Sequence, residues 1–213
     1  MKYNWRLYGK WLLFGSCICM FLLFAHQIGS KDPLWFDEYI YQALTTIMNE
    51  RVTNVFKLLT RFGNLEAFVI IGLITFYLVH SRRNRLLIVA NLGIVFGCNV
   101  LLKMAFSRPR PLDIALIKES GFSFPSGHAM VSVAFYGFLI YLIFQSQQPK
   151  WRKIGASIVL GCIIIGVGIS RIYLGVHYAS DVIAGASLSL AYVILLTTFA
   201  RKYDNKKGKQ DVR

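Results

Sequence analysis

Six long apolar stretches constrain the fold of this chain more than any other feature of its sequence. They run over residues 11–28, 65–79, 86–106, 127–144, 154–169 and 182–200. A segment needs about 20 mostly apolar residues to cross roughly 30 Å of hydrocarbon, so the two shortest stretches must draw on their flanks. Within lipid every backbone polar group must be hydrogen-bonded inside its own element, which predicts helices. We therefore expect an all-α protein, a single domain over residues 1–213 built as a bundle of six transmembrane helices.

The composition and the distribution of charge also indicate a membrane protein. Only 16% of the residues are charged and 55% are hydrophobic, whereas about a quarter of the residues in soluble domains are charged. The net charge of +14 would suit a nucleic-acid-binding protein if it formed one patch. Instead, 15 Lys/Arg and only 2 Asp/Glu lie in residues 1–10, 80–85, 145–153 and 201–213, all on one side of the predicted bundle. The positive-inside rule then places both termini in the cytoplasm, and nucleic acid is not expected as a partner.

A segment of mixed polarity, residues 31–64, joins the first two apolar stretches. Asp32 followed by Pro33 fits a helix start, because a proline at the first helical position has no helical hydrogen bond to lose. Apolar residues then recur at positions 36, 40, 44, 47 and 48, close to the helical repeat. This pattern predicts an amphipathic helix in the outer interface, either a simple connector or a lid over a lipid site.

Polar residues gather at one side of the predicted bundle. Counted from a cytoplasmic N-terminus, the third and fifth stretches end outside, and the fourth and sixth begin there. These four ends carry the segments KMAFSRPRP (103–111), FPSGH (124–128) and SRIYLGVHYASD (170–181). Three clusters that are distant in sequence therefore converge on one rim, and ionisable residues at membrane depth indicate a functional site.

The residue types at this rim indicate an oxyanion site. Lys103, Arg110 and Arg171, here called the cation trio, suit phosphate oxygens, which a guanidinium can bind through two parallel hydrogen bonds. Ser126 is expected at a helix N-cap, where free N–H groups attract an anion, and Gly127 lets the backbone approach that anion closely. The sequence offers no cluster of acidic residues for Mg²⁺ and no further ligands beside its histidines for zinc, so no cofactor is expected.

Two histidines supply the remaining chemistry. His177 and Asp181 are four positions apart and share a helix face, so the carboxylate can accept from one ring nitrogen and leave a lone pair on the other. That lone pair is expected to attack phosphorus. His128 suits the general acid that protonates the departing alkoxide. The predicted reaction is therefore hydrolysis of a phosphomonoester through a phosphohistidine.

The three segments together resemble the signature of the type-2 phosphatidic acid phosphatase family, lipid phosphate phosphatases related to vanadium haloperoxidases. KMAFSRPRP fits K-x6-R-P, PSGH is complete, and SRIYLGVHYASD fits S-R-x5-H-x3-D, all in order within residues 103–181. The resemblance implies that His177 is the nucleophile, Asp181 its orienting partner and His128 the acid. The phosphate ligands that it implies are Lys103, Arg110, Ser126, Gly127 and Arg171. Arg108 lies outside the pattern and receives no role.

The expected substrate follows from the resemblance, because the motifs bind phosphate and not the lipid behind it. We expect phosphatidylglycerophosphate, converted to phosphatidylglycerol at the extracytoplasmic side, with undecaprenyl diphosphate as the alternative. A haloperoxidase would use the same pocket, but six membrane spans do not suit a diffusible halide. A lipid transporter is the alternative of another class, since it needs anion binding and no nucleophile. The sequence leaves the oligomeric state open.

Overall fold

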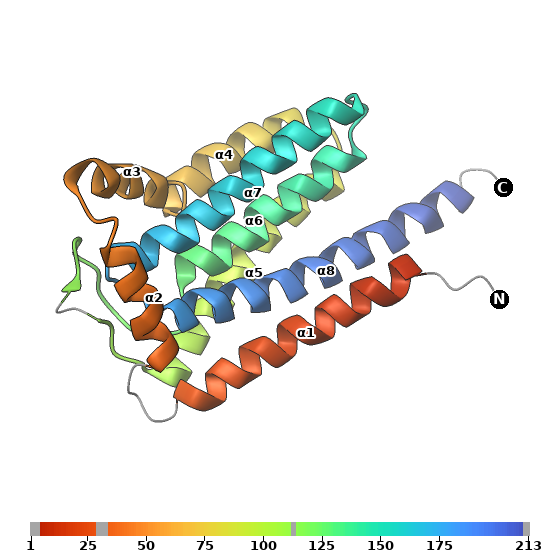
Figure 1. Ribbon diagram of the computed structural model, residues 1–213. Coiled ribbons are helices and arrows are strands. Elements are labelled where there is room, and N and C mark those ends of the chain that lie inside the picture. Colours follow the sequence, from red (N-terminus) through yellow and green to blue (C-terminus); the bar gives the residue numbers. More distant parts are fainter. Residues whose placement is uncertain (1–4, 29–33, 112–113, 211–213) are drawn as a thin grey trace.

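The computed structural model describes residues 5–28, 34–111 and 114–210, with side chains over 8–28, 34–111 and 114–203. Throughout these residues the regular structure is helical, which confirms the predicted all-α class (Figure 1). The helices are α1 Trp5–Gln27, α2 Trp35–Thr45, α3 Glu50–Arg61, α4 Leu65–Leu78, α5 Arg82–Phe106, α6 Gly127–Gln145, α7 Lys150–Tyr173 and α8 Ala179–Gln210.

Within the described residues, five helices are long and apolar enough to cross a membrane, namely α1, α5, α6, α7 and α8. The predicted span 65–79 coincides with α4, whose 14 residues reach only about 21 Å at 1.5 Å per residue. Helices α3 and α4 meet the same criterion when taken together, as a pair bent by 51°. The pair is either a broken span or a re-entrant loop, so the described residues contain five candidate spans, or six if the pair counts as one.

Four of the six predicted spans lie inside the observed helices, and the spans 11–28 and 65–79 extend one residue beyond α1 and α4. The third stretch, 86–106, ends with α5, but that helix already begins at Arg82, where the Ser81 side chain accepts a hydrogen bond from Asn84 N. The fifth stretch, 154–169, is extended at both ends by α7. Apolarity marks the part of a helix within hydrocarbon, whereas helical hydrogen bonding continues into the polar flanks.

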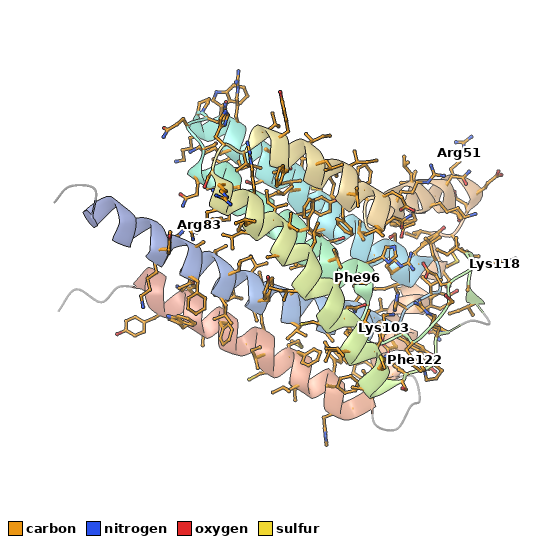
Figure 2. The ribbon with its side chains drawn as sticks, turned by 180° about the vertical axis from the view of Figure 1, so that it is seen from behind. Arg51, Arg83, Phe96, Lys103, Lys118 and Phe122 are labelled. Atoms are coloured by element: carbon orange, nitrogen blue, oxygen red, sulfur yellow. The ribbon has the colours of Figure 1, made fainter. Side chains whose placement is uncertain are left out.

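Helix α6 is the centre of the bundle. It packs against α5, α7 and α8 and buries Phe135, Tyr136 and Phe138 completely or nearly so. In lipid such packing stabilises a bundle mainly through van der Waals contact. The start of α1 and the end of α8 lie at one end of the bundle, and α2 and α3 cover the opposite end (Figure 1). Figure 2 shows Lys103 near the covered end, far from Arg83.

The segment 31–64 contains the predicted amphipathic helix as α2, which carries the apolar positions 36, 40 and 44, and a second helix, α3, which was not predicted. Residues 46–49 separate them, and Asn49 Oδ1 accepts a hydrogen bond from Val52 N at 3.0 Å to start α3. The predicted start at Asp32 and Pro33 lies outside the described residues, and α2 begins at Trp35. A capping side chain directly after the apolar repeat thus starts a second helix in a new direction.

The apolar face of α2 is covered by protein. Its side chains Phe36, Ile40 and Leu44 pack against a buried cluster that includes Ile172 at the end of α7 and Val182 at the start of α8. The predicted apolar periodicity is therefore present, but it faces the ends of two bundle helices. This placement brings α2 next to the residues that carry the motifs.

Candidate active site

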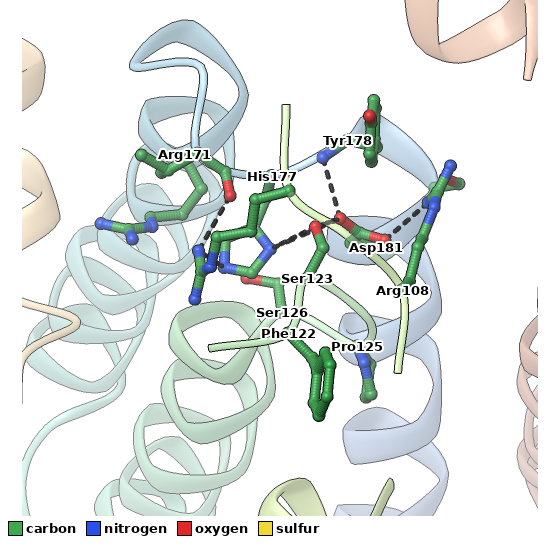
Figure 3. A network of polar contacts seen from close by, with 12 residues as sticks. Arg108, Phe122, Ser123, Pro125, Ser126, Arg171, His177, Tyr178 and Asp181 are labelled. Carbon is green, nitrogen blue, oxygen red and sulfur yellow. Dashed lines mark hydrogen bonds and ion pairs between the residues drawn. The ribbon is translucent and has the colours of Figure 1, made fainter. Parts of the chain in front are cut away.

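Residues of the three motif segments lie close together, among them Arg108, Ser126 and His177 (Figure 3). They lie at the end of the bundle that α2 and α3 cover, where Figure 2 shows Lys103. A cavity of about 660 Å³ lies there, and five of the predicted site residues line it: Lys103, Arg110, Gly127, His128 and His177. Buried beside it are Ser126, Arg171 and Asp181. Among the residues that the structure describes, no group of three His, Cys, Asp or Glu side chains could hold a metal ion. The structure thus brings all eight predicted side chains to one place.

The loop that carries His177 depends on a glycine. Helix α7 ends at Tyr173, and Gly175 then has φ +68°, a conformation that L side chains rarely adopt. A Cβ on Gly175 would lie 2.4 Å from the Ile114 carbonyl oxygen, so only glycine fits. The turn brings His177 N to 3.3 Å from the Arg171 carbonyl oxygen. His177 is therefore held against the end of α7 by backbone contacts.

His177 is a neutral imidazole with an unprotonated Nε2 atom. Arg110 Nη1 lies 3.1 Å from Nε2, and because a guanidinium can only donate, Nε2 must accept through its lone pair. The ring proton is then on Nδ1, which faces Asp181 Oδ2 and Ser123 Oγ, each at 3.4 Å. Burial and the nearby cation trio lower the pKa of His177 well below its ordinary value. The result is a lone pair beside the cavity, as nucleophilic attack requires.

Asp181 is fully buried, and both of its carboxylate oxygens have partners (Figure 3). Oδ2 accepts from Tyr178 N at 2.9 Å and from Ser123 Oγ, and it also faces His177. Oδ1 accepts from Arg108 Nη1 at 2.6 Å. Sequence reasoning missed Ser123 and set Arg108 aside. One feature of the sequence indicated a role for Arg108, namely its charge at the end of an apolar stretch. An arginine that is buried there needs an acidic partner.

Protein groups occupy the cation trio in this structure. Arg171 forms an ion pair with one carboxylate oxygen of Glu119, and Arg110 Nη2 lies 3.8 Å from the other. Lys103 Nζ donates to the Phe122 carbonyl oxygen. Arg171 Nε is buried and has no hydrogen-bond partner among the described residues, so one donor is unused. The Glu119 carboxylate, which sequence reasoning missed, shows that these arginines can hold an anion beside the cavity.

His128 holds a proton at the wall of the cavity. Its Nε2 lies 3.0 Å from Asn64 Oδ1, and because an amide oxygen only accepts, Nε2 carries the proton. Gly63, which lies between α3 and α4, packs closely against the imidazole ring of His128. A Cβ on Gly63 would lie 2.6 Å from His128 Cδ2. Sequence reasoning missed both Asn64 and Gly63. The bent pair of helices thus contributes to the site.

The start of α6 has the expected cap. Ser126 is the N-cap residue, and its Oγ accepts from Ala129 N at 3.5 Å. This side chain is fully buried and does not line the cavity, so its contact with phosphate stays a prediction. Gly127 does line the cavity, and a Cβ there would lie 2.8 Å from Asn99 Oδ1. The N-terminus of α6 therefore lies next to the cations, which suits an anion.

Residues 84–204 match the family model described as the PAP2 superfamily, which covers more than half of the chain. This chain belongs to the PAP2 superfamily. Phosphatidylglycerophosphatase B of Bacillus subtilis is 34% identical to this PAP2 protein over 204 residues, which are 91% of this chain and 98% of that protein. The undecaprenyl-diphosphatase of Sulfolobus acidocaldarius is 24% identical over 190 residues, 84% of this chain and 85% of that protein.

A solved structure shares the fold of this PAP2 protein. The crystal structure of a transmembrane PAP2 type phosphatidylglycerolphosphate phosphatase from Bacillus subtilis superposes with a TM-score of 0.79 at 30% identity. The match covers 89% of this chain and 96% of that one. The predicted resemblance is confirmed, and the protein is a multi-pass membrane lipid phosphate phosphatase, as its sequence predicts.

Proposed function

We propose that this PAP2 protein hydrolyses phosphatidylglycerophosphate to phosphatidylglycerol through a phosphohistidine on His177. One observation carries the proposal: a histidine with an unprotonated Nε2 lines the same cavity as Lys103 and Arg110. The similarity to Bacillus subtilis phosphatidylglycerophosphatase B, which extends over nearly the whole of both chains, supports the choice of substrate.

The cavity suits a lipid that carries a phosphate. Away from Lys103 and Arg110 its wall includes the apolar side chains Phe68, Leu92 and Phe96. Lys103 and Phe96 both belong to α5, with the cation nearer the covered end (Figure 2). A phosphate bound at the cations therefore leaves its acyl chains along an apolar wall within the membrane.

In the first step the His177 Nε2 lone pair forms a bond to phosphorus while the bond from phosphorus to the lipid oxygen breaks. Arg110 leaves Nε2 and Glu119 leaves Arg171, so that both guanidinium groups bind phosphate oxygens. Their charge then stabilises the transition state more than the free enzyme. The Asp181 carboxylate stabilises the positive charge that develops on the imidazole. His128 acts as an imidazolium: it gives one of its two ring protons to the departing alkoxide, which leaves as the lipid alcohol, and becomes a neutral imidazole.

In the second step a water molecule attacks phosphorus and the bond between phosphorus and Nε2 breaks. His128, now a neutral imidazole, accepts one proton of this water and becomes an imidazolium again. Inorganic phosphate is released, and His177 returns to its neutral form. Two steps with moderate barriers thus replace the single high barrier of phosphomonoester hydrolysis, one of the slowest uncatalysed reactions known.

The proposal places the active site at the extracytoplasmic face and both termini in the cytoplasm. The concentration of Lys/Arg in residues 1–10, 80–85, 145–153 and 201–213 supports this orientation. The arrangement of the bundle agrees with it, since α1 begins and α8 ends at the end opposite α2 (Figure 1).

Phosphate release from a panel of lipids in detergent tests the proposal. We expect the highest kcat/KM for phosphatidylglycerophosphate, and complete loss of release from every lipid in His177→Ala. His80→Ala is the matched control, because His80 is exposed and precedes α5 at the opposite end of the bundle. A higher kcat/KM for undecaprenyl diphosphate would assign that lipid instead. Lipid transport without phosphate release, unchanged in His177→Ala, would indicate a transporter.

A further inference from the structure

Arg108 is a completely buried arginine with an acidic partner on each side. Its Nη1 lies 2.6 Å from Asp181 Oδ1, and its Nη2 lies 2.9 Å from Asp37 Oδ2. The three side chains are at most 1% exposed. Its guanidinium carbon also lies 4.0 Å from the centre of the Tyr178 ring. Buried charges are costly unless they are paired and hydrogen-bonded, and here one cation is shared by two carboxylates.

Asp37 joins this group from α2, far from the motif segments in sequence. Its Oδ1 accepts from Ser180 N at 2.7 Å, and its Oδ2 accepts from Ser180 Oγ at 2.8 Å. The same Ser180 Oγ accepts from Arg108 Nη1 at 2.8 Å. Asp37 therefore binds both the residue next to Asp181 and the arginine that holds Asp181. Helix α2 is anchored at the start of α8, which favours a fixed support over a mobile lid.

We propose that Asp37 and Arg108 are positioning residues for the nucleophile, acting through Asp181. Arg108 holds Asp181 Oδ1, which leaves Oδ2 directed at His177 Nδ1. This inference rests on the proposed function, in which His177 attacks phosphorus.

Asp37 also contributes through its negative charge, which adds to that of Asp181 behind the His177 ring. Alone, the pair of Arg108 and Asp181 would be neutral, and the guanidinium would draw the negative charge of Asp181 away from His177. With Asp37 added, the three side chains carry a net charge of −1 behind the imidazole. That charge is needed most when Nε2 bonds to phosphorus and the ring becomes cationic, so it favours the transition state over the free enzyme.

The test compares Asp37→Asn with Glu38→Gln in purified protein. Both changes remove one negative charge from α2, but Glu38 is exposed and has no part in this group. In Asp37→Asn we expect the rate of p-nitrophenolate release at saturating p-nitrophenyl phosphate to fall about 10²-fold, as for a misplaced catalytic group. The inhibition constant of inorganic phosphate should stay within about twofold, because the cation trio is untouched. Glu38→Gln should match the native protein in both measurements.

Two results would overturn the inference. A folded Asp37→Asn protein with the native rate would show that Asp37 does not act on the nucleophile. Parallel loss of rate and of phosphate binding would show that Asp37 only maintains the fold. If Asp37→Asn cannot be recovered folded, Arg108→Lys is judged by the same two measurements, since lysine keeps the charge but loses the fork that spans both carboxylates. Activity in His177→Ala would instead refute the proposed function itself.

Discussion

Substituting Glu119 by Gln should tighten the binding of phosphate. The Glu119 carboxylate is paired with Arg171 and lies 3.8 Å from Arg110, so the substrate must displace it from two of the three cations. Glutamine keeps the shape of the side chain and one acceptor oxygen but removes the charge. In the free enzyme the substituted side chain therefore competes less strongly with phosphate for the arginines. The free energy of the phosphate-bound state is unaffected, because the side chain no longer contacts the arginines there.

The size of the effect follows from the kind of contact that is removed. A hydrogen bond to a charged group contributes roughly 1.5–3 kcal/mol, and a neutral one about 0.5–1.5 kcal/mol. The Glu119 side chain is 26% exposed, and solvent weakens its interaction with the arginines. The free energy lost when the charged hydrogen bond becomes a neutral one is therefore small, about 1 kcal/mol. Since 1.4 kcal/mol corresponds to a factor of ten, phosphate should bind about fivefold more tightly in Glu119→Gln.

Competitive inhibition of p-nitrophenyl phosphate hydrolysis by inorganic phosphate measures this change directly. Glu66→Gln is the matched control, because Glu66 lines the same cavity and is exposed. The inhibition constant of phosphate in Glu66→Gln should therefore equal that of the native protein. Weaker phosphate binding in Glu119→Gln would refute the reasoning, since it would mean that Glu119 organises the arginines for phosphate instead of competing with it.

Three further predictions concern cofactor, orientation and the second histidine. Activity should survive EDTA and be inhibited by orthovanadate, which mimics the transition state on His177; loss of activity with EDTA that Mg²⁺ restores would contradict this. A cysteine introduced at Ser120 should react with an impermeant thiol reagent added outside intact cells, whereas one at Asn84 should not, and the reverse pattern would invert the orientation. His128→Ala should slow hydrolysis of lipid phosphates about 10² to 10⁴-fold more than that of p-nitrophenyl phosphate, whose leaving group needs little protonation. Equal losses on both substrates would reject His128 as the acid.

Most of the fold is a local property of the sequence, and it could be predicted for that reason. The apolar stretch 127–144 became α6, Gly127–Gln145, because hydrocarbon leaves a chain no option but helix, and Ser126 caps it as expected. The bent pair of α3 and α4 is the exception. Neither the length of α4 nor the apolar repeat at positions 36–48 indicates where α3 bends into α4.

The convergence of the motif residues could likewise be predicted, because alternating spans bring the ends of four helices to one rim. Spacing within one segment was enough to pair His177 with Asp181, whose Nδ1 and Oδ2 lie 3.4 Å apart. The shared helix face predicted for the two residues is wrong, because α8 begins at Ala179 and His177 lies in the turn before it. These inferences needed only the direction of each helix and the chemistry of the side chains at its end.

The partners of the buried charges were decided by the tertiary structure alone. Arg108 binds Asp37, which is 71 residues away, and Arg171 binds Glu119, which is 52 residues away. The sequence indicates that a buried arginine needs a carboxylate, but several carboxylates lie within its reach along the chain. Which one it meets depends on how α2 and the loop before α6 pack over the ends of α7 and α8, since ion pairs form only where packing brings the groups within about 4 Å.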